Sequence, residues 1–218
     1  MILASSSPRR RELLALGGID FQVRPAALDE TVQPGEDPQA YVQRLSRGKA
    51  QAAAAAAPEA VIIGADTTVV LDNEILGKPT DGNEAEAMLR QLRGRTHRVL
   101  TAISVLDSAS AAQRDEVVTA QVPMRAYSDD EIRAYVATGN PLDKAGAYAI
   151  QFQGFKPVDA ARFTDCFATV MGLPVCRVLS LLEKAGLPPR LERPPANCHH
   201  FDAAACPIYP LIDQDGGQ

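Results

Sequence analysis

The sequence predicts an α/β fold, arranged as one domain or as two lobes that share a sheet. Strand-like and helix-like segments alternate along most of the 218 residues. An apolar content of 46% allows a chain of this length to bury a sizeable core. Two long alternating segments, 97–106 and 116–127, are expected to be antiparallel neighbours.

The expected helices are marked by residues that start or stop a helix. In Pro8–Leu16, Ser7 is placed to cap the start, Pro8 suits the first turn and Gly17-Gly18 follows the end. The segment 38–56 ends in an alanine-rich run, AQAAAAAA, which strongly favours helix. The remaining expected helices are 84–92, 129–138 and 174–185.

The expected strands are short apolar or alternating runs. Residues 69–76, VVLDNEIL, alternate around Asp72-Asn73, a pair that favours a tight hairpin turn. The stretch after 186 is rich in proline and poor in apolar periodicity, so 187–218 is expected to be a loosely ordered extension of a domain spanning 1–186. The expected strands are 1–4, 21–24, 60–64, 97–106, 116–127 and 147–150.

Charge and hydropathy argue against several classes of protein. A net charge of −5 does not favour attraction to nucleic acid or to an anionic membrane. No apolar run approaches the roughly 20 residues that span a bilayer, and the first apolar run is too short for the core of a signal peptide. We therefore expect a cytoplasmic protein with neither a membrane nor a stable nucleic-acid partner.

Three arginines follow a serine run at the predicted start of the first helix. Because a helix N-terminus carries partial positive charge, cations there are unfavourable unless something negative binds. Serine hydroxyls, free backbone N–H groups and the guanidinium groups of Arg9 and Arg10 together suit phosphate oxygens. The alternative is a solvated basic helix start. The spacing of a P-loop is absent.

Four further charged residues favour phosphate chemistry. Asp66, in GADTTVV, is expected at the end of a buried strand, where α/β proteins display ligand-binding groups. Lys78 follows the hairpin, Glu30 lies in a polar loop and Lys49 lies in the next helix. Carboxylates at Glu30 and Asp66 suit Mg²⁺, which takes few protein ligands and keeps water and phosphate oxygens. Taken singly, each residue has a structural alternative: Asp66 could be an ordinary turn residue, and Glu30 and Lys49 could be solvated surface charges.

Five motifs, in order within 1–186, closely resemble the Maf family of septum-formation-inhibitor-like proteins: LASSSPRRRELL, GADTTVVLDNEILGKP, GRTHRVLTAISV, PLDKAGAYAIQ and VMGLP. The resemblance implies a mixed, twisted sheet flanked by helices, with two lobes around a nucleotide cleft, as in the ITP-pyrophosphatase-like fold. It also implies hydrolysis of a nucleoside triphosphate to the monophosphate and pyrophosphate. The implied cofactor is Mg²⁺, with Mn²⁺ or Co²⁺ as alternatives, and a homodimer is suggested.

The same resemblance implies roles for individual residues. Asp66 matches the family's catalytic carboxylate, a proton acceptor, and three residues match positions associated with base selection: Arg9, Thr67 and Gln151. Other matching positions bind phosphate or metal: Ser5, Ser7, Arg10, Glu30, Lys49 and Lys78. The sequence leaves open which carboxylate is the base and which holds metal.

The motifs SPRR, GADT and AGAYAIQ are typical of the branch that prefers dTTP and UTP. The branch that uses 7-methyl-GTP carries Trp and Gln where this chain has Arg9 and Thr67. The chain departs from the family pattern after Gln151, where Phe152 replaces a common glycine and could offer a stacking face to the base. Nucleotide-pool housekeeping or cell-division arrest would be the cellular role. The alternative is a nucleotide-sensing regulator of septum formation with little catalysis.

The histidines and cysteines favour structural interpretations. His97 begins a strand, and a capping or bridging role is favoured over catalysis. Cys166 and Cys176 are expected to be buried apolar residues. The segment CHHFDAAAC contains zinc-ligand types without a finger spacing, so a zinc site is disfavoured there. Its residues are Cys198, His199, His200 and Cys206.

Overall fold

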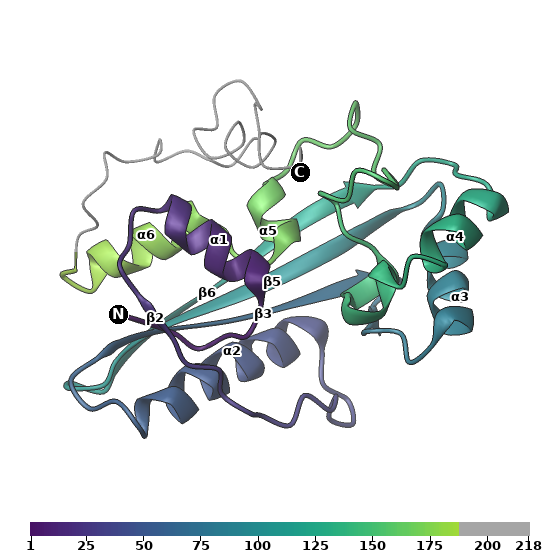
Figure 1. Cartoon of the computed structure of the whole chain (residues 1–218). Coiled ribbons are helices and arrows are strands. Elements are labelled where there is room, and N and C mark those ends of the chain that lie inside the picture. The colour runs from purple at the N-terminus through teal and green to yellow at the C-terminus, as the bar shows by residue number, and fades with distance from the viewer. Residues whose placement is uncertain (188–218) are drawn as a thin grey trace.

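The computed structural model describes residues 1–187 and contains one mixed, twisted sheet of six strands (Figure 1). The strand order is β2-β1-β3-β5-β6, and β4 also pairs with β3. The first three strands in this order are parallel, and the pairings of β3 with β5 and of β5 with β6 are antiparallel. The strands are β1 (Ile2–Leu3), β2 (Gln22–Val23), β3 (Val61–Leu71), β4 (Glu74–Leu76), β5 (Thr96–Asp107) and β6 (Ala112–Pro123). The predicted fold class is confirmed.

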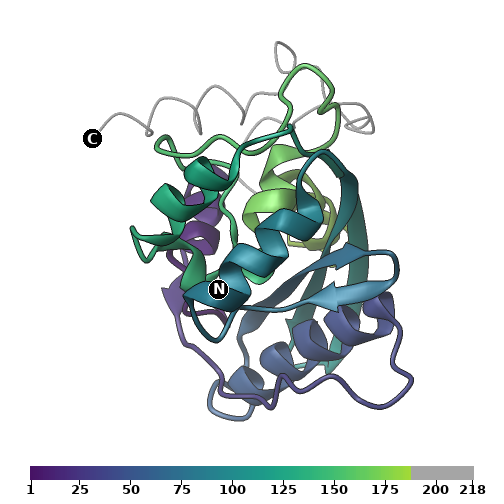
Figure 2. The same cartoon turned by 90° about the vertical axis from the view of Figure 1, so that its right-hand side faces the viewer.

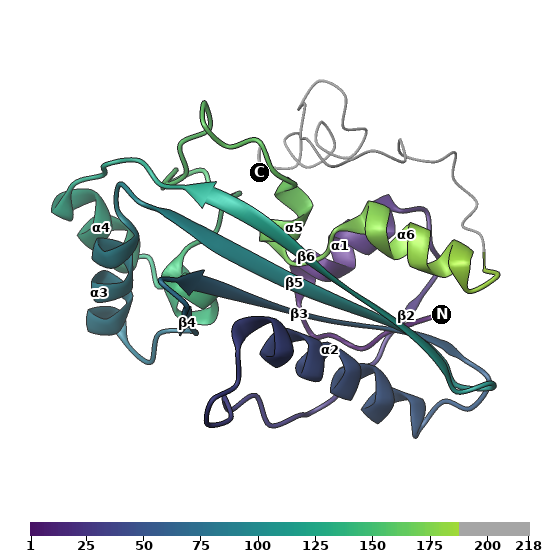
Figure 3. The same cartoon turned by 180° about the vertical axis from the view of Figure 1, so that it is seen from behind.

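Helices cover both faces of the sheet and pack mainly on β3, β5 and β6. Helix α2 (Pro38–Ala54) lies on one face, and α1 (Pro8–Leu16), α5 (Phe167–Met171) and α6 (Val175–Lys184) lie on the other (Figures 1 and 3). Strand β3 is buried along nearly its whole length because both of its faces are covered. Leu14, Ile63 and Leu179 belong to the core between the sheet and α1 and α6.

The second lobe is built at the far end of the long strands. Helices α3 (Gly82–Leu92) and α4 (Asp129–Val136) pack together there and lie nearest the viewer in Figure 2. Their apolar faces enclose a separate core that includes Leu89, Ile132 and Phe155. The two short 3-10 helices, Asn140–Asp143 and Ala145–Ala147, connect this lobe to the centre of the molecule.

The sheet has a gap along one edge of β3. On this edge β1 pairs with Ile62 and Ile63, and β4 pairs with residues 69–71. The opposite edge of β3 pairs with β5 over residues 61–70 without interruption. Within the described chain, residues 64–68 therefore have no strand beside them on the first edge, so this edge of β3 is open between β1 and β4. Asp66 and Thr67 lie in this gap.

Two predictions about strands are wrong. Residues 60–64 do not form a complete strand, because β3 continues to Leu71, so Asp66 lies within a strand rather than at its end. Residues 147–150 are not a strand either: Gly146 and Ala147 have φ angles of 67° and 59°, which interrupt extended backbone. The apolar pattern there reflects tertiary burial of Tyr148 and Ala149.

The other boundaries agree with expectation to within a few residues, although the sequence did not predict α5. This helix has five residues, too few to show helical periodicity. Ser7 caps α1 as expected, and the hairpin turns at Asp72 and Asn73, whose φ angles are 50° and 68°. No helix within 1–187 is long and apolar enough to cross a membrane. Of the predicted extension 187–218, residues 188–218, with the Cys198–Cys206 cluster, lie outside the described residues.

Candidate active site

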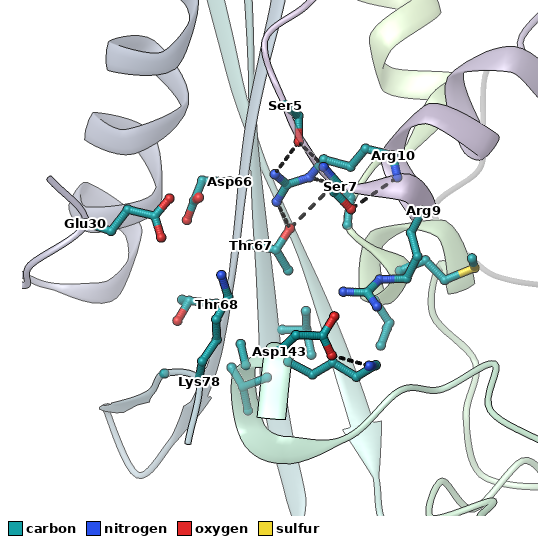
Figure 4. A pocket seen from close by; sticks show the side chains of 18 of the residues that line it. Ser5, Ser7, Arg9, Arg10, Glu30, Asp66, Thr67, Thr68, Lys78 and Asp143 are labelled. Carbon is teal, nitrogen blue, oxygen red and sulfur yellow. Dashed lines mark hydrogen bonds and ion pairs between the residues drawn. The ribbon is translucent and has the colours of Figure 1, made fainter. Parts of the chain in front are cut away.

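A cavity of about 690 Å³ opens at the gap in the sheet, between the two lobes. Its walls come from the loop after β1, the start of α1, the centre of β3, the segment after β4 and the 3-10 helices (Figure 4). All ten residues predicted from the sequence line this cavity: Ser5, Ser7, Arg9, Arg10, Glu30, Lys49, Asp66, Thr67, Lys78 and Gln151.

The serine turn is fixed by its own hydrogen bonds. Ser5 Oγ accepts from the backbone N–H of Ser7 at 3.2 Å, and Ser7 Oγ accepts from that of Arg10 at 3.4 Å. These contacts hold the N-terminus of α1 against the cavity. The first helical turn contains no acidic residue, so the positive end of the helix is not neutralised from within it.

Arg10 is held by neutral oxygen atoms. Its Nε donates to the carbonyl of Gly172 at 2.9 Å, its Nη2 to Thr67 Oγ1 at 3.1 Å and its Nη1 to Ser5 Oγ at 3.3 Å. Among residues 1–187 no carboxylate forms an ion pair with this guanidinium. Burial lowers the pKa of Arg10, although the charge of Asp66 acts in the opposite direction. A partly buried cation without a carboxylate partner is a place for an anion.

Lys49 is held in the opposite way. Its Nζ lies 2.6 Å from Asp66 Oδ1 and 2.6 Å from Glu30 Oε1, so one ammonium group bridges two carboxylates. Lys49 and Asp66 are buried, whereas 47% of the Glu30 side chain is exposed. Burial would raise the pKa of Glu30, but the hydrogen bond and charge of Lys49, helped by Lys78 and Arg10, hold it below its usual value.

Close packing of α2 on β3 brings Lys49 to Asp66. A Cβ atom at Gly64 would lie 2.2 Å from the carbonyl oxygen of Ser46, so only glycine allows this approach. Lys49 is three residues after Ser46 on the same helix face, and Asp66 is two residues after Gly64 on the same strand face. The contact therefore places the two charged side chains opposite each other.

The strand alternation separates the two groups of residues. Asp66 faces α2, whereas Thr67, the next residue of β3, faces Arg10 and α5. Figure 4 shows Glu30 and Asp66 on one side of the strand and Arg10 and Thr67 on the other. Both pairs reach one cavity because the edge of β3 is open between β1 and β4.

The second lobe contributes residues that the sequence did not single out. Asp143 and Lys144 line the cavity, and Arg9 faces Asp143 across it (Figure 4). Burial would raise the pKa of Asp143, but its hydrogen bond from Lys144 holds the value low. Both residues lie in the PLDKAGAYAIQ motif, which was the available signal. Within 1–187 neither Arg9 nor Lys78 has an ion-pair partner.

Two aromatic contacts place residues outside the cavity. Phe152 does not line it and packs against Tyr135, with ring centroids 5.3 Å apart, so the predicted stacking face for a base is wrong.

His97 is buried and its Nε2 shares a hydrogen bond of 2.8 Å with the hydroxyl of Tyr148. Burial lowers the pKa of His97 to about 4, and the ring is neutral at pH 7. Cys166 and Cys176 pack against the core but are only partly buried, less than predicted.

The fold and the cavity define an α/β protein whose site combines a cluster of cations suited to binding phosphate with a pair of carboxylates. The chain belongs to the Maf family, because the family model described as "Maf-like protein" matches residues 1–185. A dTTP/UTP pyrophosphatase of Anaeromyxobacter dehalogenans (strain 2CP-1) is 48% identical over 89% of this chain and 98% of its own length. Proteins of the same description from Myxococcus xanthus and Geobacter sp. (strain M21) are 48% and 46% identical, over 86% and 85% of this chain and 93% and 95% of their own lengths.

Proposed function

We propose that this protein hydrolyses nucleoside triphosphates, with dTTP and UTP preferred, to the nucleoside monophosphate and pyrophosphate. The observation that carries the proposal is Arg10, a partly buried cation that is held by three neutral oxygens and lines the cavity. Similarity to proteins described as dTTP/UTP pyrophosphatases supports the choice of reaction and base.

The triphosphate is bound by the wall that carries Arg10. A guanidinium has five N–H donors, and three of those of Arg10 are used within the protein. The two that remain suit phosphate oxygens, together with the backbone N–H of Arg9 in the first turn of α1. Lys78 and Arg9, which also line the cavity, add positive charge.

Asp66 is placed to accept a proton from the attacking water. Among residues 1–187 its carboxylate hydrogen-bonds only to Lys49, through Oδ1, so Oδ2 remains for water. Water oxygen forms a new bond to phosphorus, the bond between that phosphorus and the bridging α–β oxygen breaks, and the pyrophosphate or monophosphate leaves with the bridging oxygen. The hydrogen bond from Lys49 holds the Asp66 carboxylate in one orientation, which a proton acceptor requires.

The paired carboxylates fit a divalent cation. No group of three potential metal ligands occurs within 1–187, but Mg²⁺ typically uses one or two carboxylates and completes its shell with water and phosphate oxygens. Glu30 and Asp66 supply this number and type of ligand. A bound ion would neutralise charge on the triphosphate. Mn²⁺ and Co²⁺ remain alternatives to Mg²⁺.

Gln151 is proposed to read the base. Its amide offers one donor and one acceptor, matching the adjacent carbonyl and imide N–H of uracil or thymine. A site that pairs these groups rejects a base that leaves them unpaired. Gln151→Ala should therefore reduce the discrimination between bases more than the best rate. A homodimer and a cytoplasmic location stay predictions.

The proposal is tested by incubating the full-length protein and Mg²⁺ with each of the common nucleoside triphosphates and, separately, with 7-methyl-GTP. Products are separated by anion-exchange chromatography, and kcat/KM is measured for each base. We expect pyrophosphate and monophosphate, with dTTP and UTP best. Orthophosphate and a diphosphate would overturn the reaction, and a purine preference would overturn the base assignment. Tight binding with no turnover would support the nucleotide-sensing alternative.

A further inference from the structure

A chain of hydroxyl groups leads from Arg10 away from the cavity. Thr67 Oγ1, which accepts from Arg10, lies 2.9 Å from Thr101 Oγ1. Thr101 Oγ1 in turn donates to the carbonyl oxygen of Thr169 at 2.8 Å. Thr101 is fully buried at the centre of β5, directly opposite Thr67 in the sheet, and it does not line the cavity.

The direction of every hydrogen bond in this chain is determined. A carbonyl oxygen only accepts, so Thr101 must give its single proton to Thr169. Thr101 then has only lone pairs for Thr67, and Thr67 must donate to it. The carbonyl of Gly172 is a poorer acceptor for Thr67 because it lies 3.5 Å away and already accepts from Arg10. Thr67 Oγ1 consequently presents a lone pair to Arg10.

The chain forms a closed ring through α5. Arg10 donates to Gly172, which follows α5, and Thr101 donates to Thr169, which lies within α5. Both ends of the hydroxyl chain are thus anchored to one short segment. The ring fixes the rotation of the Arg10 guanidinium and directs its unused N–H groups to the cavity. Since the Thr67 hydroxyl proton is used by Thr101, Thr67 is not free to donate it to a substrate.

We propose that Thr101 is a positioning residue for the triphosphate site, which orients Arg10 through the hydroxyl of Thr67 without touching substrate. The proposal rests on the proposed function only in taking the phosphates as the ligand of Arg10. Without the Thr101 hydroxyl, Thr67 loses its acceptor and its hydroxyl rotates toward the Gly172 carbonyl, 3.5 Å away. The lone pairs of Thr67 then no longer point at Arg10 as they do in the ring.

The test compares Thr101→Val, which keeps the shape and removes the hydroxyl, with Thr101→Ser, which keeps the hydroxyl. Ser104→Ala is the matched control, because Ser104 is also fully buried on β5 and its hydrogen bonds to Ser46 and Asp115 do not involve Arg10. Binding of inorganic pyrophosphate is measured by calorimetry, and the Arg10 Nε–H signal is followed by ¹⁵N NMR in the ligand-free protein.

For Thr101→Val we expect pyrophosphate binding to weaken by about ten-fold, as for loss of one hydrogen bond that positions a charged group. KM for dTTP should rise more than kcat falls, and the Arg10 Nε–H signal should shift. In Thr101→Ser, the pyrophosphate affinity and the kinetic constants for dTTP should return to within about two-fold of wild type, and the Arg10 Nε–H signal should return to its wild-type position. Ser104→Ala should leave the affinity, the kinetic constants and the signal unchanged.

Unchanged pyrophosphate affinity or an unchanged Arg10 signal in Thr101→Val would overturn the proposal. Equal defects in Thr101→Val and Thr101→Ser would also overturn it, because the hydroxyl would not be the cause. If the wild-type protein hydrolyses no triphosphate while the binding and NMR differences are seen, the proposed function fails and the positioning role of Thr101 is supported.

Discussion

Two of the cations that line the cavity, Arg10 and Lys49, have different partners for their charges. Arg10 is surrounded by a carbonyl and two hydroxyl groups, whereas Lys49 bridges the carboxylates of Glu30 and Asp66. The charge of Lys49 is neutralised by the protein itself, and that of Arg10 is left for a ligand. The difference separates a residue that binds the anion from one that organises the reacting carboxylates.

The chemistry of the two side chains suits these roles. The planar guanidinium of Arg10 makes three internal hydrogen bonds and still has N–H groups for phosphate oxygens. The compact ammonium of Lys49 places one charge between two carboxylates. We therefore expect substitutions at the two walls to have different consequences.

The largest effect is expected from Asp66→Asn. The amide keeps the shape and can still accept a hydrogen bond from Lys49, but it loses the charge and the basicity. Turnover of dTTP should fall by about 10³-fold or more, the scale for loss of a catalytic acid or base, with an unchanged circular dichroism spectrum. Asp72→Asn is the control, since Asp72 lies exposed in the β3–β4 turn and pairs with Arg95. Normal turnover in Asp66→Asn would remove Asp66 from the reaction centre.

Arg10→Lys is expected to have the second largest effect. Lysine keeps the charge but cannot span Gly172, Thr67 and Ser5 while also presenting a fork to phosphate. We expect kcat/KM for dTTP to fall by about 10²-fold, as for loss of more than one charge-assisted hydrogen bond. Arg11→Lys, one residue further along α1 and exposed, should behave like wild type. Equal behaviour of the two variants would show that charge alone matters at Arg10.

Lys49→Met is expected to change the pH dependence. Burial raises the pKa of Glu30, and Lys49, helped by Lys78 and Arg10, holds it below its usual value; without Lys49 this pKa therefore rises. Glu30 then becomes protonated at a higher pH. The acid limb of kcat/KM, measured between about pH 4 and 8, the range in which carboxylates and histidines titrate, should move upward. An acid limb that stays in place or moves downward would show that Lys49 does not set the charge of Glu30.

Much of the site could be predicted from the sequence, because motifs and turn residues are local signals. All ten predicted residues line the cavity. The different treatment of the arginines could not be predicted, since Arg9, Arg10 and Arg11 look equivalent in the chain. They become distinct in the fold for two reasons. Successive side chains point in different directions around α1, and the carbonyl of Gly172, 162 residues further along the chain, lies beside Arg10.

The contact of Lys49 with two carboxylates also has no local signal. Glu30, Lys49 and Asp66 come from a loop, a helix and a strand, and their meeting depends on how closely α2 packs on Gly64. For the same reason the opening in the sheet was not predicted. It arises where β1 ends and before β4 begins, and it is not a property of β3 alone.

The most direct measurement is the affinity of a non-hydrolysable dTTP analogue with an α,β-imido bridge, measured by calorimetry in the presence of Mg²⁺ for Arg10→Met and Lys49→Met. Both variants remove one positive charge from the same cavity, so any difference reports direct contact rather than the long-range field. We predict that Arg10→Met weakens binding by about 100-fold or more and Lys49→Met by less than about ten-fold, as expected for a charge-assisted contact and for a charge already neutralised. Equal losses, or a larger loss in Lys49→Met, would contradict the assignment of Arg10 as the anion-binding cation.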